Sequence, residues 1–186
     1  MRRGLDRQKL NRFLQALGST TDRPTRIYLT GGATALLLGW RDTTIDIDVK
    51  IDPENDDILR ALSGLKEELN INIELASPSD FIPEAPGWES RSKFIAQEGV
   101  VTFYHYDFYA QALSKIERFH DRDVRDVKEM LRRGIIEPGR LRELFGAIDP
   151  LLYRFPAISQ RVFKHNLESL LGDTSFRQES PEPPSR

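Results

Sequence analysis

The 186-residue sequence predicts an α/β (α+β) fold, a small mixed sheet flanked by helices and followed by a helical bundle. Strand-like alternation and helical spacing are both found before residue 107, whereas only helical spacing follows it. Apolar residues make up 39% of the chain, which is enough for a buried core. We therefore expect an α/β core with an N-terminal helix over residues 1–106, a helical region packed on it over 107–172, and a disordered tail over 173–186.

The individual elements follow from the same two periodicities. Strands are expected over residues 26–30, 44–52 and 71–75, and as a hairpin over 93–96 and 100–104. Helices are expected over 5–17, 33–38, 53–70, 109–116, 124–131, 141–145 and 158–171, with Pro53 opening the third of them. A loop rich in Pro and Gly is expected over 77–90.

Acidic residues alternate with apolar ones in the clearest strand. Asp46 and Asp48 are two residues apart and therefore point to the same face, whereas Ile45 and Ile47 are expected to enter the core. Glu74 has the same parity in the next strand, so three carboxylates converge if the two strands are neighbours. Such a cluster repels itself unless a cation such as Mg²⁺ neutralises it, although alternating Asp residues are also typical of a solvated strand face.

A Gly pair lies between the first strand and its helix, 15 residues before Asp46. The backbone N–H groups of Gly31 and Gly32 either bind a phosphate beside the metal or only form a tight turn. The pair is not part of a Walker loop or of a G-x-G-x-x-G motif.

Several chemistries are excluded by the residues present. The chain has no Cys, which excludes disulfides, thiol nucleophiles and thiolate metal sites. The three His residues lack zinc-site spacing, and no Gly-x-Ser-x-Gly motif is present. The longest apolar run, over 33–40, is too short to span a bilayer, so we expect a cytoplasmic protein without membrane contact.

Four segments together resemble a known superfamily. Residues 28–36 and 41–49 resemble the GG(S/T) turn and the Asp-x-Asp strand of nucleotidyltransferase-fold proteins. Residues 74–83 and 115–126 resemble the small bacterial nucleotidyltransferases related to the AbiEii toxin group. The resemblance covers about residues 24–135, and the combination of motifs is specific.

This resemblance implies catalytic roles for five residues. Asp46 and Asp48 would hold two Mg²⁺ ions, and Glu74 would be the third acidic position, as a metal ligand or as the activator of an acceptor hydroxyl. Lys115 would reach a phosphate, and Asp126 would orient Lys115 or Arg122. The alternative for the helical residues is a solvated, salt-bridged surface.

The nucleoside triphosphate (NTP) would be bound by a second set of residues. The resemblance assigns this role to Gly31, Gly32, Thr34 and Arg122. Arg41, just before the Asp pair, either clamps a phosphate or pairs with a nearby carboxylate.

The predicted function is Mg²⁺-dependent transfer of a nucleoside monophosphate from an NTP to a hydroxyl of RNA, such as the 3′ end of tRNA, or of a protein. The resemblance also implies a toxin–antitoxin or phage-defence setting with a cognate antitoxin as partner. The alternatives are a catalytically silent domain that binds a nucleotide or partner, and a kinase-like phosphotransferase.

The formal net charge of −2 hides an uneven distribution along the chain. Residues 1–41 carry 8 basic and 2 acidic groups, residues 42–98 carry 5 and 14, and residues 115–164 carry 12 and 8. The acidic, metal-competent segment is therefore flanked by two basic ones, which are suited to a triphosphate or an RNA backbone.

Overall fold

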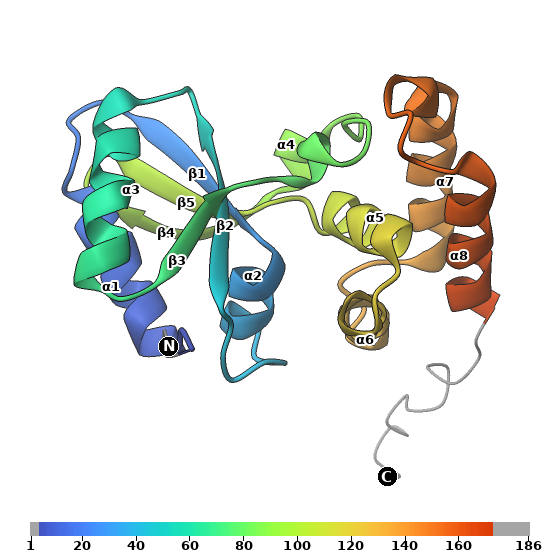
Figure 1. The fold of residues 1–186 in the computed structure, drawn as a ribbon, viewed down its shortest axis with the longest axis horizontal. Coiled ribbons are helices and arrows are strands. Elements are labelled where there is room, and N and C mark those ends of the chain that lie inside the picture. Colours follow the sequence, from blue (N-terminus) through green and yellow to red (C-terminus); the bar gives the residue numbers. More distant parts are fainter. Residues whose placement is uncertain (1–3, 173–186) are drawn as a thin grey trace, which may run out of the picture.

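The computed structural model describes residues 4–172, so the tail expected over 173–186 lies outside the described residues. A sheet with its covering helices forms one side of the molecule, and a group of helices forms the other (Figure 1). The elements of the first side are α1 (Arg7–Gly18), β1 (Thr25–Thr30), α2 (Gly31–Leu37), β2 (Asp46–Asp52), α3 (Asp56–Glu68), β3 (Asn72–Leu75), β4 (Lys93–Glu98) and β5 (Val101–His105). The remaining elements are the 3₁₀ helix η1 (Pro78–Asp80), α4 (Trp88–Arg91), α5 (Phe108–Arg118), α6 (Asp121–Arg132), α7 (Pro138–Ile148), the 3₁₀ helix η2 (Asp149–Arg154) and α8 (Gln160–Gly172).

The five strands form one mixed sheet in the order β3-β2-β1-β5-β4. The central strand β1 is antiparallel to β2 and parallel to β5. The strand β3 runs parallel to β2, and β4 and β5 form the antiparallel hairpin that the sequence predicts. The predicted α/β fold with a mixed sheet and C-terminal helices is therefore confirmed.

Alternate side chains of β1 enter two different hydrophobic clusters. Ile27 and Leu29 are fully buried in the cluster that joins the sheet to α1 and α3. Tyr28, between them, belongs to the cluster that contains α5 to α8. Its ring lies 4.9 Å from that of Trp88 and 6.1 Å from that of Tyr106, so aromatic packing joins the sheet to the helical side.

The structure corrects three local predictions. Pro53 does not open a helix; α3 begins at Asp56, and its N-cap is Asn55, whose side chain accepts hydrogen bonds from the backbone N–H groups of Asp57 and Ile58. Ile45 does not enter the core; it precedes the first residue of β2 and is 62% exposed. The segment expected to be a loop over 77–90 contains η1 and the start of α4. Pro78 occupies the first position of η1, a turn that is capped by Ser77 and Asp80.

Within residues 4–172, no helix has the length and apolar character needed to cross a bilayer.

Candidate active site

The register between β2 and β3 brings the predicted carboxylates to one part of the sheet. Asp48 lies directly opposite Glu74, and Asp46 lies opposite Asn72. The Asn72 side-chain amide donates to Asp46 at 2.7 Å and to Glu74 at 3.0 Å. The Asn72 amide therefore lies between two negatively charged carboxylates and is hydrogen-bonded to both.

Asp48 has an unusual electrostatic environment. Burial raises the pKa of its carboxyl from 3.8 to about 6, and repulsion from Glu74 and Asp46 adds to this rise. Within residues 4–172 no group donates a hydrogen bond to the Asp48 carboxylate. A cation placed beside it would relieve both the burial cost and the repulsion.

Asp48 and Glu74 open onto a cavity of about 100 Å³. One face of α5 supplies the opposite wall, because residues three, four and seven positions apart lie on the same side of a helix. The remaining lining comes from the β1–α2 turn, from the chain after β3 and from η1. The α5 residues of the wall are Gln111, Ser114, Lys115 and Arg118.

Two cations therefore face two carboxylates across one small cavity. The positive charges of Arg118 and Lys115 lower the pKa of Asp48, but burial and repulsion from Glu74 and Asp46 raise it by more. Of the wall residues, only Lys115 was predicted from the sequence. The polar stripe at 111, 114, 115 and 118, on a helix otherwise rich in buried apolar residues, is the signal that marks the others.

Gly31 and Gly32 both lie where the backbone passes so close to a neighbouring side chain that there is no room for a Cβ atom. Gly31 has a φ of +61°, and a Cβ atom there would lie 2.6 Å from a carboxylate oxygen of Asp48. A Cβ atom on Gly32 would lie 2.0 Å from the hydroxyl oxygen of Thr44. The N–H of Gly31 donates to Gln111 at 3.0 Å, so Gln111 fixes the turn against α5.

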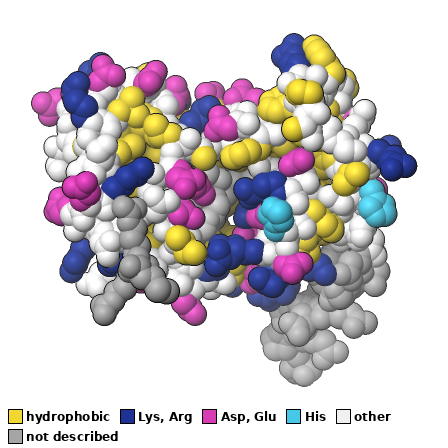
Figure 2. Space-filling model, in the orientation of Figure 1, with side chains coloured by type: hydrophobic (Ala, Val, Ile, Leu, Met, Phe, Trp, Pro, Cys, Tyr) yellow, Lys and Arg dark blue, Asp and Glu magenta, His cyan; other side chains and the backbone are white. Residues whose placement is uncertain are grey.

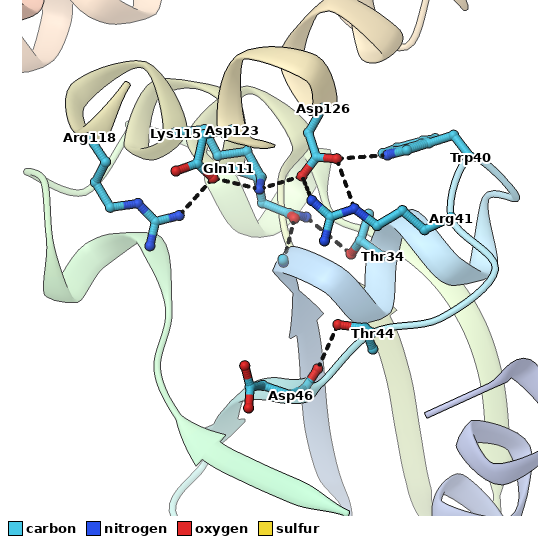
Figure 3. A network of polar contacts seen from close by, with 11 residues as sticks. Thr34, Trp40, Arg41, Thr44, Asp46, Gln111, Lys115, Arg118, Asp123 and Asp126 are labelled. Atoms are coloured by element: carbon cyan, nitrogen blue, oxygen red, sulfur yellow. Dashed lines mark hydrogen bonds and ion pairs between the residues drawn. The ribbon is translucent and has the colours of Figure 1, made fainter. Parts of the chain in front are cut away.

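Asp126 is the centre of a buried polar network (Figure 3). Its carboxylate accepts hydrogen bonds from Lys115 at 2.7 Å, from Arg41 at 2.5 Å and from the indole of Trp40 at 3.1 Å. Asp126 thus contacts Lys115, and its Arg partner is Arg41 rather than Arg122; its predicted role in orienting Lys115 for catalysis stays a prediction. Next to it, Asp123 accepts from Lys115 and from Arg118, both at 3.1 Å.

Besides Gly32 and Asp126, four predicted site residues lie outside the small cavity. Thr34 is fully buried, and its hydroxyl bonds to the Leu29 carbonyl and to His105. Asp46 lies next to the cavity without lining it. Arg41 and Arg122 line a second, larger hollow of about 800 Å³.

The donor set suits Mg²⁺ bound together with a substrate. Within the described part of the chain, no three His, Cys, Asp or Glu side chains are already arranged as a complete metal site. Mg²⁺ is commonly held by one or two carboxylates, with phosphate oxygens and waters completing its octahedron. Asp48 and Glu74, adjacent in register and open to the cavity, match this pattern, and Asp46 is the next carboxylate along β2.

The comparisons with known proteins identify a family. A family model described as "Nucleotidyltransferase of unknown function (DUF6036)" matches residues 8–166, which is 159 of the 186 residues. No curated protein and no solved structure matches the chain. The finer resemblance to the AbiEii group stays a prediction. Since the matched region spans both the sheet and the helices that form the cavity, the chain belongs to this family of nucleotidyltransferases of unknown function.

Proposed function

We propose that the protein transfers a nucleoside monophosphate from an NTP to an acceptor hydroxyl in a Mg²⁺-dependent reaction. The observation that carries this proposal is the placement of Asp48 and Glu74 opposite Lys115 and Arg118 across one cavity. Carboxylates for a hard cation and cations for phosphate oxygens are the two components that phosphoryl chemistry needs.

Mg²⁺ would be held by Asp48 and Glu74, with Asp46 beside them. When bound, it neutralises charge that develops on the α-phosphoryl oxygens and on the leaving pyrophosphate. Lys115 and Arg118 hold the triphosphate from the other side and fix its direction in the cavity.

The transfer step is a displacement at the α-phosphorus. The acceptor oxygen forms a bond to this phosphorus while the bond to the bridging oxygen of the β-phosphate breaks, and pyrophosphate leaves. Glu74 opens onto the same cavity as Asp48, and its carboxylate oxygen that does not hold Mg²⁺ accepts the proton of the acceptor hydroxyl. The acceptor is RNA or a protein side chain. The toxin–antitoxin or phage-defence setting, with an antitoxin as partner, rests on the sequence resemblance.

The test uses NTPs labelled at the α or the γ phosphate, with Mg²⁺ and total RNA. Label from the α position should appear on RNA or on protein. It should disappear in the Asp48→Asn/Glu74→Gln variant and on removal of Mg²⁺ with a chelator.

Asp52→Asn is the matched control, because Asp52 lies on the same strand but pairs with Arg26 away from the cavity. It should keep the activity. Label from the γ position alone would show a kinase instead, and no label from either position would support a silent binding domain.

A further inference from the structure

A second hollow lies between the α2–β2 connection and α6, and we name it the arginine groove. Its volume is about 800 Å³. Six cations and three carboxylates line it, together with Trp40 and Thr43. The cations are Arg41, Arg122, Arg125, Lys128, Arg132 and Arg133. In Figure 2, Lys and Arg side chains gather in this region of the surface, beside α6.

The α6 cations form a row along one side of the helix. Arg122, Arg125 and Lys128 follow at intervals of three residues, and Arg132 continues the row after four. At a rise of about 1.5 Å per residue, the row from Arg122 to Arg132 is roughly 15 Å long. A linear array of cations on this scale suits a linear array of anions.

Not all of these cations are equally available. Arg41 pairs with Asp126, and Arg132 and Arg133 pair with Glu129. Arg122 and Arg125, by contrast, have no ion-pair partner within residues 4–172. Their guanidinium groups therefore retain all five N–H donors, in the planar arrangement that binds phosphate through two hydrogen bonds.

The arginine groove is connected to the small cavity through a shared ion pair. Asp126 lines the groove, and Lys115, which bonds to it at 2.7 Å, lines the cavity. Trp40, which also bonds to Asp126, adds a fixed aromatic ring to the groove. Aromatic rings beside cations are typical of surfaces that bind single-stranded nucleic acid, where bases stack.

We infer that the arginine groove binds the phosphate backbone of a single-stranded RNA. Arg122 and Arg125 contact successive phosphates, and the RNA end extends toward the cavity. The role of this RNA as acceptor rests on the proposed function, whereas the binding itself does not.

The test measures binding of a fluorescently labelled 12-nucleotide RNA by anisotropy, without NTP or Mg²⁺. The Arg122→Ala/Arg125→Ala variant should bind on the order of tenfold more weakly, because two phosphate contacts are lost. The slope of log Kd against log salt should fall by about 1.4, as expected for two contacts on a single strand. Arg122→Lys/Arg125→Lys keeps the charge and should retain most of the binding.

Two further variants show whether the loss of RNA binding is specific to the groove. Arg60→Ala/Lys66→Ala removes the same charge from α3, outside the groove, and should bind RNA like the parent protein. Asp48→Asn/Glu74→Gln should still bind RNA, so loss of the transfer activity alone leaves this inference intact.

Two results would overturn the inference. The first is an RNA affinity that is unchanged in Arg122→Ala/Arg125→Ala. The second is an absence of RNA binding by the parent protein at a low salt concentration of roughly 50 mM. A polyglutamate peptide that binds the groove where RNA does not would assign it to an acidic protein segment. Melting temperatures equal to that of the parent protein would show that each variant is folded.

Discussion

The ammonium nitrogen of Lys115 lies 2.7 Å from a carboxylate oxygen of Asp126 and 3.1 Å from one of Asp123. The three side chains are between 4% and 9% exposed. A Lys ammonium has three N–H donors, and the two carboxylates take two of them. Because Lys115 also lines the small cavity, one donor remains for a phosphate oxygen there.

Replacing Lys115 by Met should therefore affect both stability and substrate binding. Two buried carboxylates lose a partner, which should lower the free energy of unfolding by about 3–5 kcal/mol, measured by urea denaturation. The KM for NTP should rise in the labelled-NTP assay. Lys115→Arg retains the charge and should recover most of the stability; a Lys115→Met protein as stable as the parent would show that the two carboxylates do not depend on this cation.

The raised pKa of Asp48 makes the metal-free protein less stable as the pH rises. The native state holds a proton on this carboxyl up to about pH 6, whereas the unfolded chain releases it near pH 3.8. The free energy of unfolding should therefore fall between these values by about 2–3 kcal/mol and stay lower above pH 6. Asp48→Asn should be more stable than the parent at about pH 8 but not at about pH 3.5, as measured by urea denaturation.

Mg²⁺ should reverse this effect of Asp48 at about pH 8. Millimolar Mg²⁺ should raise the melting temperature of the parent protein and leave that of Asp48→Asn/Glu74→Gln unchanged. Equal shifts in both proteins would place the cation elsewhere.

His105 should give the opposite pH dependence. Burial lowers the pKa of its imidazole from 6.5 to about 4, so the unfolded chain binds a proton in a pH range where the native state does not. Stability should therefore decline by up to about 3 kcal/mol as the pH falls from 6.5 to 4. His105→Gln should remove this decline from the pH profile of unfolding, whereas substitution of the exposed His165 should leave it in place.

The turn at Gly31 should tolerate no side chain. In Gly31→Ala, the new Cβ would lie 2.6 Å from Asp48 in a backbone with a φ of +61°. The positive φ alone costs about 1–2 kcal/mol, and displacement of Asp48 should in addition reduce the transfer activity by on the order of 100-fold.

The variant Gly39→Ala separates the backbone cost of a positive φ from the displacement of Asp48, which Gly31→Ala combines. Gly39 has a φ of +79° with nothing within 4 Å of an added Cβ, so its variant carries the backbone cost without the contact. It should lose stability, as seen by thermal unfolding, and keep its activity. An active Gly31→Ala protein would show that the approach to Asp48 is not needed.

The strand parity of the sequence predicted which carboxylates share a face, because the side-chain period of a strand is fixed at two. Asp48 and Glu74 lie opposite each other, as that parity allows. The sequence pattern did not place Gln111, Ser114 and Arg118 at the cavity. Spacing shows that they share one side of α5, but which element meets that side is decided by packing between distant parts of the chain.

The distance of a residue from a motif along the chain does not determine where its side chain lies. Thr34 is only two residues from the Gly pair, yet the rotation of α2 places its hydroxyl in the core beside His105. Arg41 and Asp126 are 85 residues apart and form an ion pair that no local pattern indicates. Contacts of this kind depend on how α6 lies against the α2–β2 connection.

The pairing of Asp48 with Glu74 also has a consequence for how preparations of the protein are compared. A slip of one residue between β2 and β3 would turn every side chain of one strand to the opposite face, so that either Asp48 or Glu74 would leave the shared face. Such a molecule retains its strands and helices but has no carboxylate pair. The proposed transfer activity, measured per mole of protein, should therefore count the molecules with the native strand register, a quantity that circular dichroism does not measure.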